Sequence, residues 1–210
     1  MSEASTFRIA VLASGTGTNL QAILDRLHGR HGIGVVGVGS NKNDAQALAR
    51  AEAAGIETAT FERDDYADRV ARDAALGDWL EALRVDLVAL AGYMELLSPE
   101  LVGRFANRIV NVHPALLPSF PGLDAIGQAL DAEAEVTGVT VHFVDEGVDT
   151  GPIIVQRPVQ VPADHDRDAL EAAIHAIEHE LYPEAIRMIA AGRVSLEAGY
   201  PALVRIAPGD

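Results

Sequence analysis

Apolar runs and amphipathic segments alternate along the first half of the chain. The apolar runs predict strands at 8–14, 33–40, 56–61 and 86–92. Between them, apolar positions recur with helical spacing and predict helices starting near Asn19, at 44–55 and at 66–83. The last of these helices carries the only tryptophan, Trp79, which we expect on its buried face. The run DLVALAG (86–92) is apolar at almost every position, which is typical of a strand buried on both faces in a parallel sheet.

The second half has a different pattern. It predicts a short helix after Ser98-Pro99, then strands at 108–113, 136–147 and 151–161 and a helix at 168–192. The last two strands are close together in sequence, so we expect an antiparallel pair at the edge of the sheet. The chain therefore predicts one α/β domain, with a doubly wound, mostly parallel sheet and an antiparallel edge. We expect this domain to cover 1–210, as a Rossmann-like half at about 1–106 and a second half at about 107–210.

Composition restricts the chemistry and the compartment. The chain has 210 residues and no cysteine, which excludes a disulfide framework, a thiolate nucleophile and a Cys-ligated metal. The N-terminal residues MSEASTF lack the basic and apolar segments of a signal peptide. No apolar run approaches the roughly 20 residues that span a bilayer. We therefore expect a cytoplasmic protein without a membrane partner.

Charge narrows the choice of ligands. Sixteen basic and thirty-one acidic side chains give a formal net charge of 16 − 31 = −15. Such a surface repels a phosphate backbone, so we expect no nucleic-acid partner. A small phosphorylated ligand remains possible, because backbone N–H groups in a loop can bind one phosphate locally.

A glycine-rich turn, SGTGTN (14–19), lies between the first strand and the first helix. The dinucleotide fingerprint needs a third glycine where this chain has Leu20, and an acidic residue near Ser40 to Lys42, where it has none. The P-loop pattern is also absent. We expect the turn to bind a single phosphate through Gly17, Thr18 and Asn19. The alternative is a tight turn without a ligand.

The stretch NVHPALLPSFPG (111–122) places an amide and an imidazole at the end of a strand. Asn111 and His113 are two residues apart, so their side chains project to the same face. Pro114 and the prolines after it stiffen this segment. Two donors held in parallel can receive the negative charge that develops on a carbonyl oxygen. The alternative is a buried histidine beside a structural asparagine.

An acidic loop follows a strand in VHFVDEGVDTGPII. A carboxylate beside His113 would favour its charged form and help to remove a proton from an attacking amine. Asp145, Glu146 and Asp149 are all candidates, and the alternative is a solvated acidic turn.

Together these segments resemble a known family. The stretches ASGTGTNLQAI, SNKNDA, VALAGYMELLSP, NVHPALLPSFPG, VHFVDEGVDTGPI and IEHELYP occur in the order and near the spacing seen in phosphoribosylglycinamide formyltransferases, folate-dependent enzymes of purine synthesis. The resemblance extends from about Arg8 to Arg193. It implies a formyltransferase fold, with a phosphate-binding first half and a catalytic, folate-binding second half. It also implies transfer of a formyl group from the cosubstrate 10-formyltetrahydrofolate to glycinamide ribonucleotide, without a metal.

The resemblance assigns roles to individual residues. It implies a catalytic trio of Asn111, His113 and Asp149, and so selects Asp149 from the acidic loop. It implies that the glycine-rich turn binds the substrate phosphate and that Glu178 lies near the glycinamide end. It implies folate contacts from Arg63, Met94, Glu95, Leu96, Leu97 and Asn111. The bond between Leu117 and Pro118 is expected to be cis.

The chain departs from the family pattern at two places. The family often has arginine where this chain has Glu95, so either Arg63 alone contacts the folate tail or Glu95 points away. Many members have Pro-Gly-x-His where this chain has Leu123-Asp124, which removes an accessory histidine.

Other functions compete with this interpretation. A formyltetrahydrofolate hydrolase shares the trio but generally carries an N-terminal regulatory domain, and a formyltransferase acting on another amine, such as that of methionyl-tRNA, needs a basic extension. The segment HAIEH, with His175, Glu178 and His179, fits a zinc-peptidase pattern, for which two surface histidines are the alternative. A non-catalytic nucleotide-binding module would leave the trio unused. A homodimer is compatible with the sequence.

Overall fold

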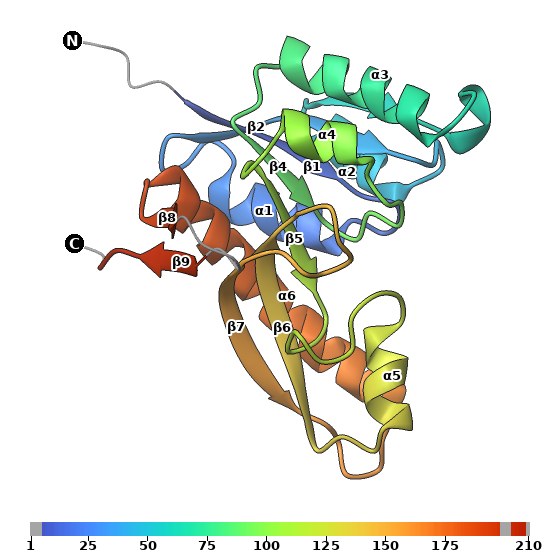
Figure 1. Cartoon of the computed structure of the whole chain (residues 1–210), viewed down its shortest axis with the longest axis vertical. Coiled ribbons are helices and arrows are strands. Elements are labelled where there is room, and N and C mark those ends of the chain that lie inside the picture. Colours follow the sequence, from blue (N-terminus) through green and yellow to red (C-terminus); the bar gives the residue numbers. More distant parts are fainter. Residues whose placement is uncertain (1–5, 198–202, 209–210) are drawn as a thin grey trace. The chain divides into compact units, whose positions relative to one another are not determined.

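The computed structural model describes residues 6–197 and 203–208. The chain divides into two compact units, Met1–Val110 and Asn111–Asp210. The division falls inside a single strand, β5 (Ile109–His113). Figure 1 shows the alternation of strands and helices along the first unit and the long strands and helix of the second.

The first unit has the alternating pattern that the sequence predicts. Its strands are β1 (Phe7–Leu12), β2 (Ile33–Ser40), β3 (Glu57–Thr60) and β4 (Leu87–Leu90). They follow the order β3-β2-β1-β4, and the pairs β1–β2, β1–β4 and β2–β3 are parallel. Its helices are α1 (Thr18–Leu27), α2 (Gln46–Ala53), η1 (Arg63–Asp65), α3 (Arg69–Ala82) and α4 (Pro99–Arg104). Every residue of β4 is buried, which confirms the interpretation of its apolar run.

Capping residues explain where the helices of this unit begin. Ser98 caps α4 by accepting a hydrogen bond from the Leu101 N–H, with Pro99 as the first helical residue. The helix predicted from Tyr66 begins later, at Arg69, because 63–65 form a 3₁₀ turn and the Asp68 side chain caps α3.

Trp79 fills the space that two glycines leave on β2. A Cβ at Gly37 would lie 2.8 Å from the Trp79 ring, so only glycine lets the indole approach the strand. The ring also packs against Phe61, with centroids 5.6 Å apart, and its Nε1 donates to Glu57. The tryptophan therefore lies on the face of α3 that packs on the sheet. Its Nε1–H lies at the protein surface, where it reaches the exposed Glu57.

The second unit carries the antiparallel edge. Strands β6 (Val136–Phe143) and β7 (Ile153–Gln160) pair antiparallel, as the sequence predicts. The helix α6 (Arg167–Ala190) follows them, with Asp166 as its cap. The elements that the sequence does not predict are the short helix α5 (Ala125–Asp131) and the hairpin of β8 (Val194–Glu197) and β9 (Leu203–Ile206).

Within the described residues, strands β1 to β7 form one sheet in the order β3-β2-β1-β4-β5-β6-β7, and β8 pairs only with β9. The mostly parallel α/β fold with an antiparallel edge is thereby confirmed. The strand order reverses between β1 and β4, the position at which doubly wound sheets bind ligands. The glycine-rich turn follows β1 and the segment 93–98 follows β4. No helix among the described residues is long and apolar enough to cross a membrane.

Candidate active site

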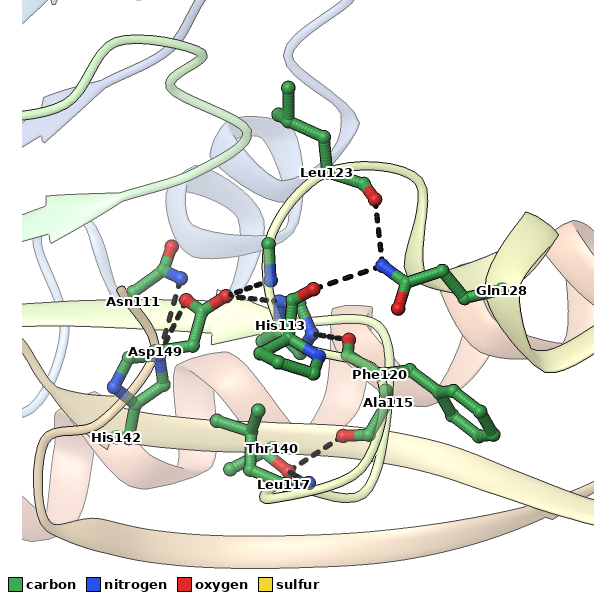
Figure 2. Close-up of polar contacts among 12 residues, drawn as sticks. Asn111, His113, Ala115, Leu117, Phe120, Leu123, Gln128, Thr140, His142 and Asp149 are labelled. Carbon is green, nitrogen blue, oxygen red and sulfur yellow. Dashed lines mark hydrogen bonds and ion pairs between the residues drawn. The ribbon is translucent and has the colours of Figure 1, made fainter. Parts of the chain in front are cut away.

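Asn111, His113 and Asp149 come together in the second unit. Asn111 and His113 lie on β5, whose alternation directs both side chains to one face. Asp149 lies in the loop after β6, in the left-handed backbone region with φ 54°. Its Oδ2 is 3.4 Å from Nδ1 of His113, which is 4 % exposed. Figure 2 shows the three side chains pointing toward one another.

The carboxylate of Asp149 is kept in its charged form. Burial alone would raise its pKa, but the hydrogen bond from His142, the Gly122 N–H and the nearby His113 together lower it. The Gly122 N–H donates to Oδ2 at 2.7 Å. This charged carboxylate lies beside the buried His113 ring.

The other two acidic candidates do not reach the site. Asp145 uses Oδ1 to accept hydrogen bonds from the Gly147 N–H at 3.0 Å and the Thr150 hydroxyl at 2.7 Å. It therefore stabilises its own turn. Glu146 is exposed. Of the three carboxylates that the sequence leaves open, the structure brings only Asp149 to His113.

The loop after β5 holds His113 from the other side. Nε2 of His113 lies 2.8 Å from the carbonyl oxygen of Phe120, so Nε2–H donates to that oxygen. The loop contains the cis bond between Leu117 and Pro118, as expected, and Phe120 has a positive φ of 55°. Nδ1 of His113 therefore faces the Asp149 carboxylate, and Nε2 faces the Phe120 carbonyl oxygen.

Thr140 on β6 fixes the same loop. Its hydroxyl donates to the carbonyl of Ala115 at 2.7 Å and accepts from the Leu117 N–H at 3.1 Å. Gln156 donates to the same hydroxyl and to the carbonyl of Leu117. The stiffness that the prolines predict is thus reinforced by a buried side-chain network, which preorganises His113.

His142 is a further member of the site that the sequence does not predict. Its Nδ1 lies 2.8 Å from the Phe143 carbonyl oxygen and so carries a proton. Nε2 lies 3.3 Å from Nδ2 of Asn111 and 3.5 Å from Oδ1 of Asp149: in the neutral ring it accepts from Asn111, and in the charged ring it donates to Asp149. His142 is 2 % exposed on a buried strand, a position typical of a core residue. Its one signal in the sequence is the motif VHFVDEG, which ends close to Asp149.

His142 orients the Asn111 carboxamide. Figure 2 shows the contact between Nδ2 of Asn111 and Nε2 of His142, in which the neutral ring accepts one N–H of the amide. The second Nδ2–H remains directed away from this contact, because an amide nitrogen carries two hydrogens. The site therefore offers one oriented amide N–H, one imidazole and one charged carboxylate, which are the groups that acyl transfer uses.

The departure at Leu123-Asp124 builds the start of α5. Asp124 caps this helix through the Gly127 N–H and pairs with Arg167, while its own φ is 54°. Leu123 is 79 % exposed, and Gln128 donates to its carbonyl. Asp124 is therefore engaged in capping α5 and in the ion pair with Arg167.

Glu178 and the two histidines near it lie on α6. Glu178 is buried, at 5 % exposed. The rings of His175 and His179 stack with centroids 6.1 Å apart. Within residues 6–197 and 203–208, no group of three or more His, Asp or Glu side chains is placed to hold a metal ion. The zinc-peptidase interpretation of HAIEH has no support in this geometry.

The glycine-rich turn lies in the first unit. Gly17 has φ 72° and precedes α1, and a Cβ there would lie 2.8 Å from the Cα of Ala47. Arg50 donates from Nε to the Thr16 carbonyl and so places its charge beside the turn. The first turn of α1 has no acidic residue, so no carboxylate of that turn opposes an anion.

The segment predicted to contact folate is partly exposed. Met94 and Leu96 are 60 % and 59 % exposed, Leu97 is half-buried and Arg63 is exposed in η1. Glu95 points away from solvent: its Oε2 lies 2.8 Å from Nη1 of the buried Arg72. Partial burial would raise the pKa of Glu95, but the hydrogen bond from Arg72 lowers it. Of the two possibilities raised by the sequence, the structure has Glu95 turned inward.

Comparisons with known proteins agree with this architecture. The formyl transferase family model matches residues 7–186. The chain is 42 % identical to the phosphoribosylglycinamide formyltransferase of Haemophilus influenzae over 191 residues, which cover 90 % of each chain. It is 40 % identical to that of Bacillus subtilis, over 87 % of this chain and 94 % of the relative. It is 48 % identical to part of the trifunctional purine biosynthetic protein adenosine-3 of Drosophila melanogaster, of whose length it spans 14 %.

A solved structure is similar over nearly the whole chain. The crystal structure of glycinamide ribonucleotide transformylase 1 from Symbiobacterium toebii has a TM-score of 0.93 and 48 % sequence identity, and the match covers 98 % of this chain and 96 % of that one. The chain therefore belongs to the formyl transferase family and, within it, to the phosphoribosylglycinamide formyltransferases.

Proposed function

We propose that this chain transfers the formyl group of 10-formyltetrahydrofolate to the amine of N1-(5-phospho-D-ribosyl)glycinamide. The products are N-formylglycinamide ribonucleotide and tetrahydrofolate, in de novo purine biosynthesis. The observation that carries the proposal is the convergence of Asn111, His113 and Asp149 in a member of this family. An amide N–H, an imidazole and a carboxylate suit the transfer of an acyl group between two nitrogens.

The reaction begins when the amine attacks the formyl carbon and forms a carbon–nitrogen bond. Negative charge then collects on the formyl oxygen of a tetrahedral intermediate. The second Nδ2–H of Asn111 donates to this oxygen, and the imidazolium of His113 stabilises its charge. His142 keeps the amide oriented through the contact at 3.3 Å.

Collapse of the intermediate breaks the bond between the formyl carbon and N10 of the folate. The amine loses one proton and N10 gains one, so the overall transfer is balanced without a further reactant. Asp149 stabilises the imidazolium and relays the proton, with water between it and the nitrogens. Its lowered pKa is consistent with a carboxylate that is charged before the amine attacks.

Segments of the first unit are proposed to bind the two substrates. The N–H groups of Gly17, Thr18 and Asn19 hold the phosphate, helped by the start of α1 and the charge of Arg50. Residues 94–97 contact the folate ring system through their backbone and their apolar side chains, and Arg63 contacts the acidic folate tail. Glu178 of the second unit contacts the glycinamide end.

The proposal includes no metal, and it places the enzyme in the cytoplasm, as a monomer or homodimer.

A direct assay tests this function. Purified protein is given 10-formyltetrahydrofolate with and without glycinamide ribonucleotide, and both tetrahydrofolate and N-formylglycinamide ribonucleotide are measured. We expect the two products in equal amounts and only when both substrates are present. Rapid release of formate without the amine would instead support a hydrolase. Formation of neither product would overturn the proposal.

A further inference from the structure

The segment Tyr93–Ser98, called the strap below, combines an exposed apolar surface with a firmly held backbone. Met94 and Leu96 are 60 % and 59 % exposed. Two apolar side chains this exposed, two residues apart on one loop, are typical of a surface that contacts a ligand. A loop with no regular secondary structure would normally be mobile. Hydrogen bonds from the rest of the first unit hold this loop in place.

Side chains of the first unit hold the strap at both ends. The Met94 N–H donates to the hydroxyl of Ser14 at 2.8 Å. Ser14 lies just after β1 and is the first residue of the glycine-rich turn. At the other end, the Ser98 N–H donates to Oδ2 of Asp73, a residue of α3 that is 1 % exposed. Each end is therefore tied to a rigid element.

The middle of the strap is held by a buried cation. Arg72 on α3 is 1 % exposed, and its Nη2 donates to the Leu96 carbonyl at 3.2 Å. The same guanidinium donates from Nε and Nη2 to Oδ1 of Asp73. A buried guanidinium requires partners for its donors, and its remaining nitrogen, Nη1, reaches Glu95 at 2.8 Å.

Glu95 completes this network from within the strap. Oε2 pairs with Arg72, and Oε1 accepts from Nδ2 of Asn41 at 3.3 Å. Asn41 in turn accepts a hydrogen bond from Ser14, the residue that holds Met94. A continuous chain of contacts thus connects the glycine-rich turn, the strap and α3, and Glu95 is its only member that is both charged and part of the strap.

We propose that Glu95 is a positioning residue: its side chain contacts no substrate, and through Arg72 and Asn41 it holds the strap so that Met94 and Leu96 present a preformed apolar surface to the ring system of the formyl donor. This inference rests on the function proposed above. Both carboxylate oxygens of Glu95 are engaged inside the unit, one with Arg72 and the other with Asn41. Preorganisation of a binding loop lowers the cost of ordering it when the ligand binds.

The variant Glu95→Gln tests this role, because it keeps the shape and removes the charge that compensates Arg72. We expect the KM for 10-formyltetrahydrofolate, and the Kd for tetrahydrofolate, to rise by at least about tenfold, the factor for one lost charge-assisted hydrogen bond. The KM for glycinamide ribonucleotide should be unchanged, and kcat should change less than the folate KM. The Met94 and Ser98 amides should exchange with deuterium faster than in the wild type.

A matched control is Glu81→Gln. Glu81 lies on α3, as Arg72 does, and forms an exposed ion pair with Arg104 of α4, so the variant removes one charge of that pair. It should alter neither folate affinity nor amide exchange in the strap, because exposed ion pairs contribute little. If Glu95→Gln does not fold, Asn41→Ala removes the partner of Oε1, leaves the buried Arg72 pair in place and should show the same changes in weaker form.

The outcomes separate this inference from the function on which it rests. Wild-type tetrahydrofolate affinity and wild-type amide exchange in Glu95→Gln would overturn the positioning role while the wild-type enzyme still made N-formylglycinamide ribonucleotide. If the wild-type protein made no such product, the proposed function would fail. Faster exchange in the variant would then still show that Glu95 holds the strap, but the strap's ligand would have to be another molecule.

Discussion

Asp149 and His113 face each other through a single carboxylate oxygen. Oδ2 lies 3.4 Å from Nδ1 of the ring and also accepts the Gly122 N–H at 2.7 Å. The other oxygen, Oδ1, is 3.5 Å from Nε2 of His142. One carboxylate therefore lies between two imidazole rings.

The first prediction concerns that charge. Asp149→Asn keeps the size of the side chain and removes the charge, so the imidazolium of His113 loses its stabilising partner. We expect kcat to fall by about 10²–10⁴-fold, the usual range for a lost acid–base group. Steady-state kinetics at saturating substrates measures this. Asp145→Asn is the matched control, because that carboxylate accepts hydrogen bonds from Gly147 and Thr150 in its own turn. Equal effects of the two changes would contradict the assignment.

The second prediction concerns the ring itself. His113→Ala removes the group that stabilises the oxyanion, and we expect turnover to fall by at least about 10²-fold. The Kd for tetrahydrofolate should change little, since the proposed folate contacts lie mainly elsewhere in the chain. A variant that kept more than about half of wild-type turnover would refute the role assigned to this histidine.

The third prediction concerns His142, which orients Asn111. In His142→Ala the amide loses its partner, and kcat should fall about tenfold, which corresponds to one hydrogen bond of roughly 1.4 kcal/mol. His142→Gln can accept from Asn111 and donate to Asp149, so it should restore part of the loss. The pH dependence of kcat should also shift in His142→Ala, because Asp149 loses one of the groups that lower its pKa. If the pH dependence of kcat did not shift in His142→Ala and His142→Gln restored no activity, His142 would only contribute to packing.

The fourth prediction concerns acid stability. The folded-state pKa of Asp149 is below its value of about 3.9 in an unfolded chain. The carboxylate therefore contributes stability that is present above about pH 3.9 and is lost as the pH falls through the lowered folded pKa. The free energy of unfolding of wild type should exceed that of Asp149→Asn near neutral pH, and the difference should shrink in acid. Urea titrations from pH 7 to pH 3 measure it, and a difference constant over that range would contradict the prediction.

The fifth prediction compares two buried threonines on β6. The hydroxyl of Thr140 has three hydrogen-bond partners, whereas among the described residues that of Thr137 has none. Thr140→Val should therefore cost about 1–3 kcal/mol per group left unsatisfied, and Thr137→Val should be neutral or stabilising. Both side chains are essentially fully buried, so the comparison isolates hydrogen bonding from burial. Thermal unfolding of the two variants distinguishes the outcomes, and equal destabilisation would show the contrast to be wrong.

Much of the fold is predictable because it depends on local pattern. The apolar run of β4, the cap at Ser98 and the pairing of β6 with β7 all follow from residues close together in sequence. The helix α5 does not, because its seven residues follow a proline-rich loop and begin at an aspartate in a left-handed conformation. Tertiary contacts such as the pair with Arg167 support it.

The site is predictable only in part, because several of its contacts join residues that are far apart in sequence. Spacing placed Asn111 beside His113, but it left three acidic residues open, and only the folded loop shows that Asp145 is already engaged with Thr150. His142 looked like any buried strand residue. The partner of Glu95 lies 23 positions away on a helix, so no local pattern connects the two.

The boundary after Val110 has a consequence for how the enzyme can diversify. The catalytic trio follows that point in the sequence: Asn111, His113 and Asp149. The glycine-rich turn and the strap, which are proposed to bind the two substrates, come before it. Mutations in the earlier segment can alter the choice of donor or acceptor and leave the bond-making groups intact. Laboratory evolution toward a new formyl donor would thus begin with a library confined to the first 110 positions, whereas evolution toward a new amine would also vary Glu178.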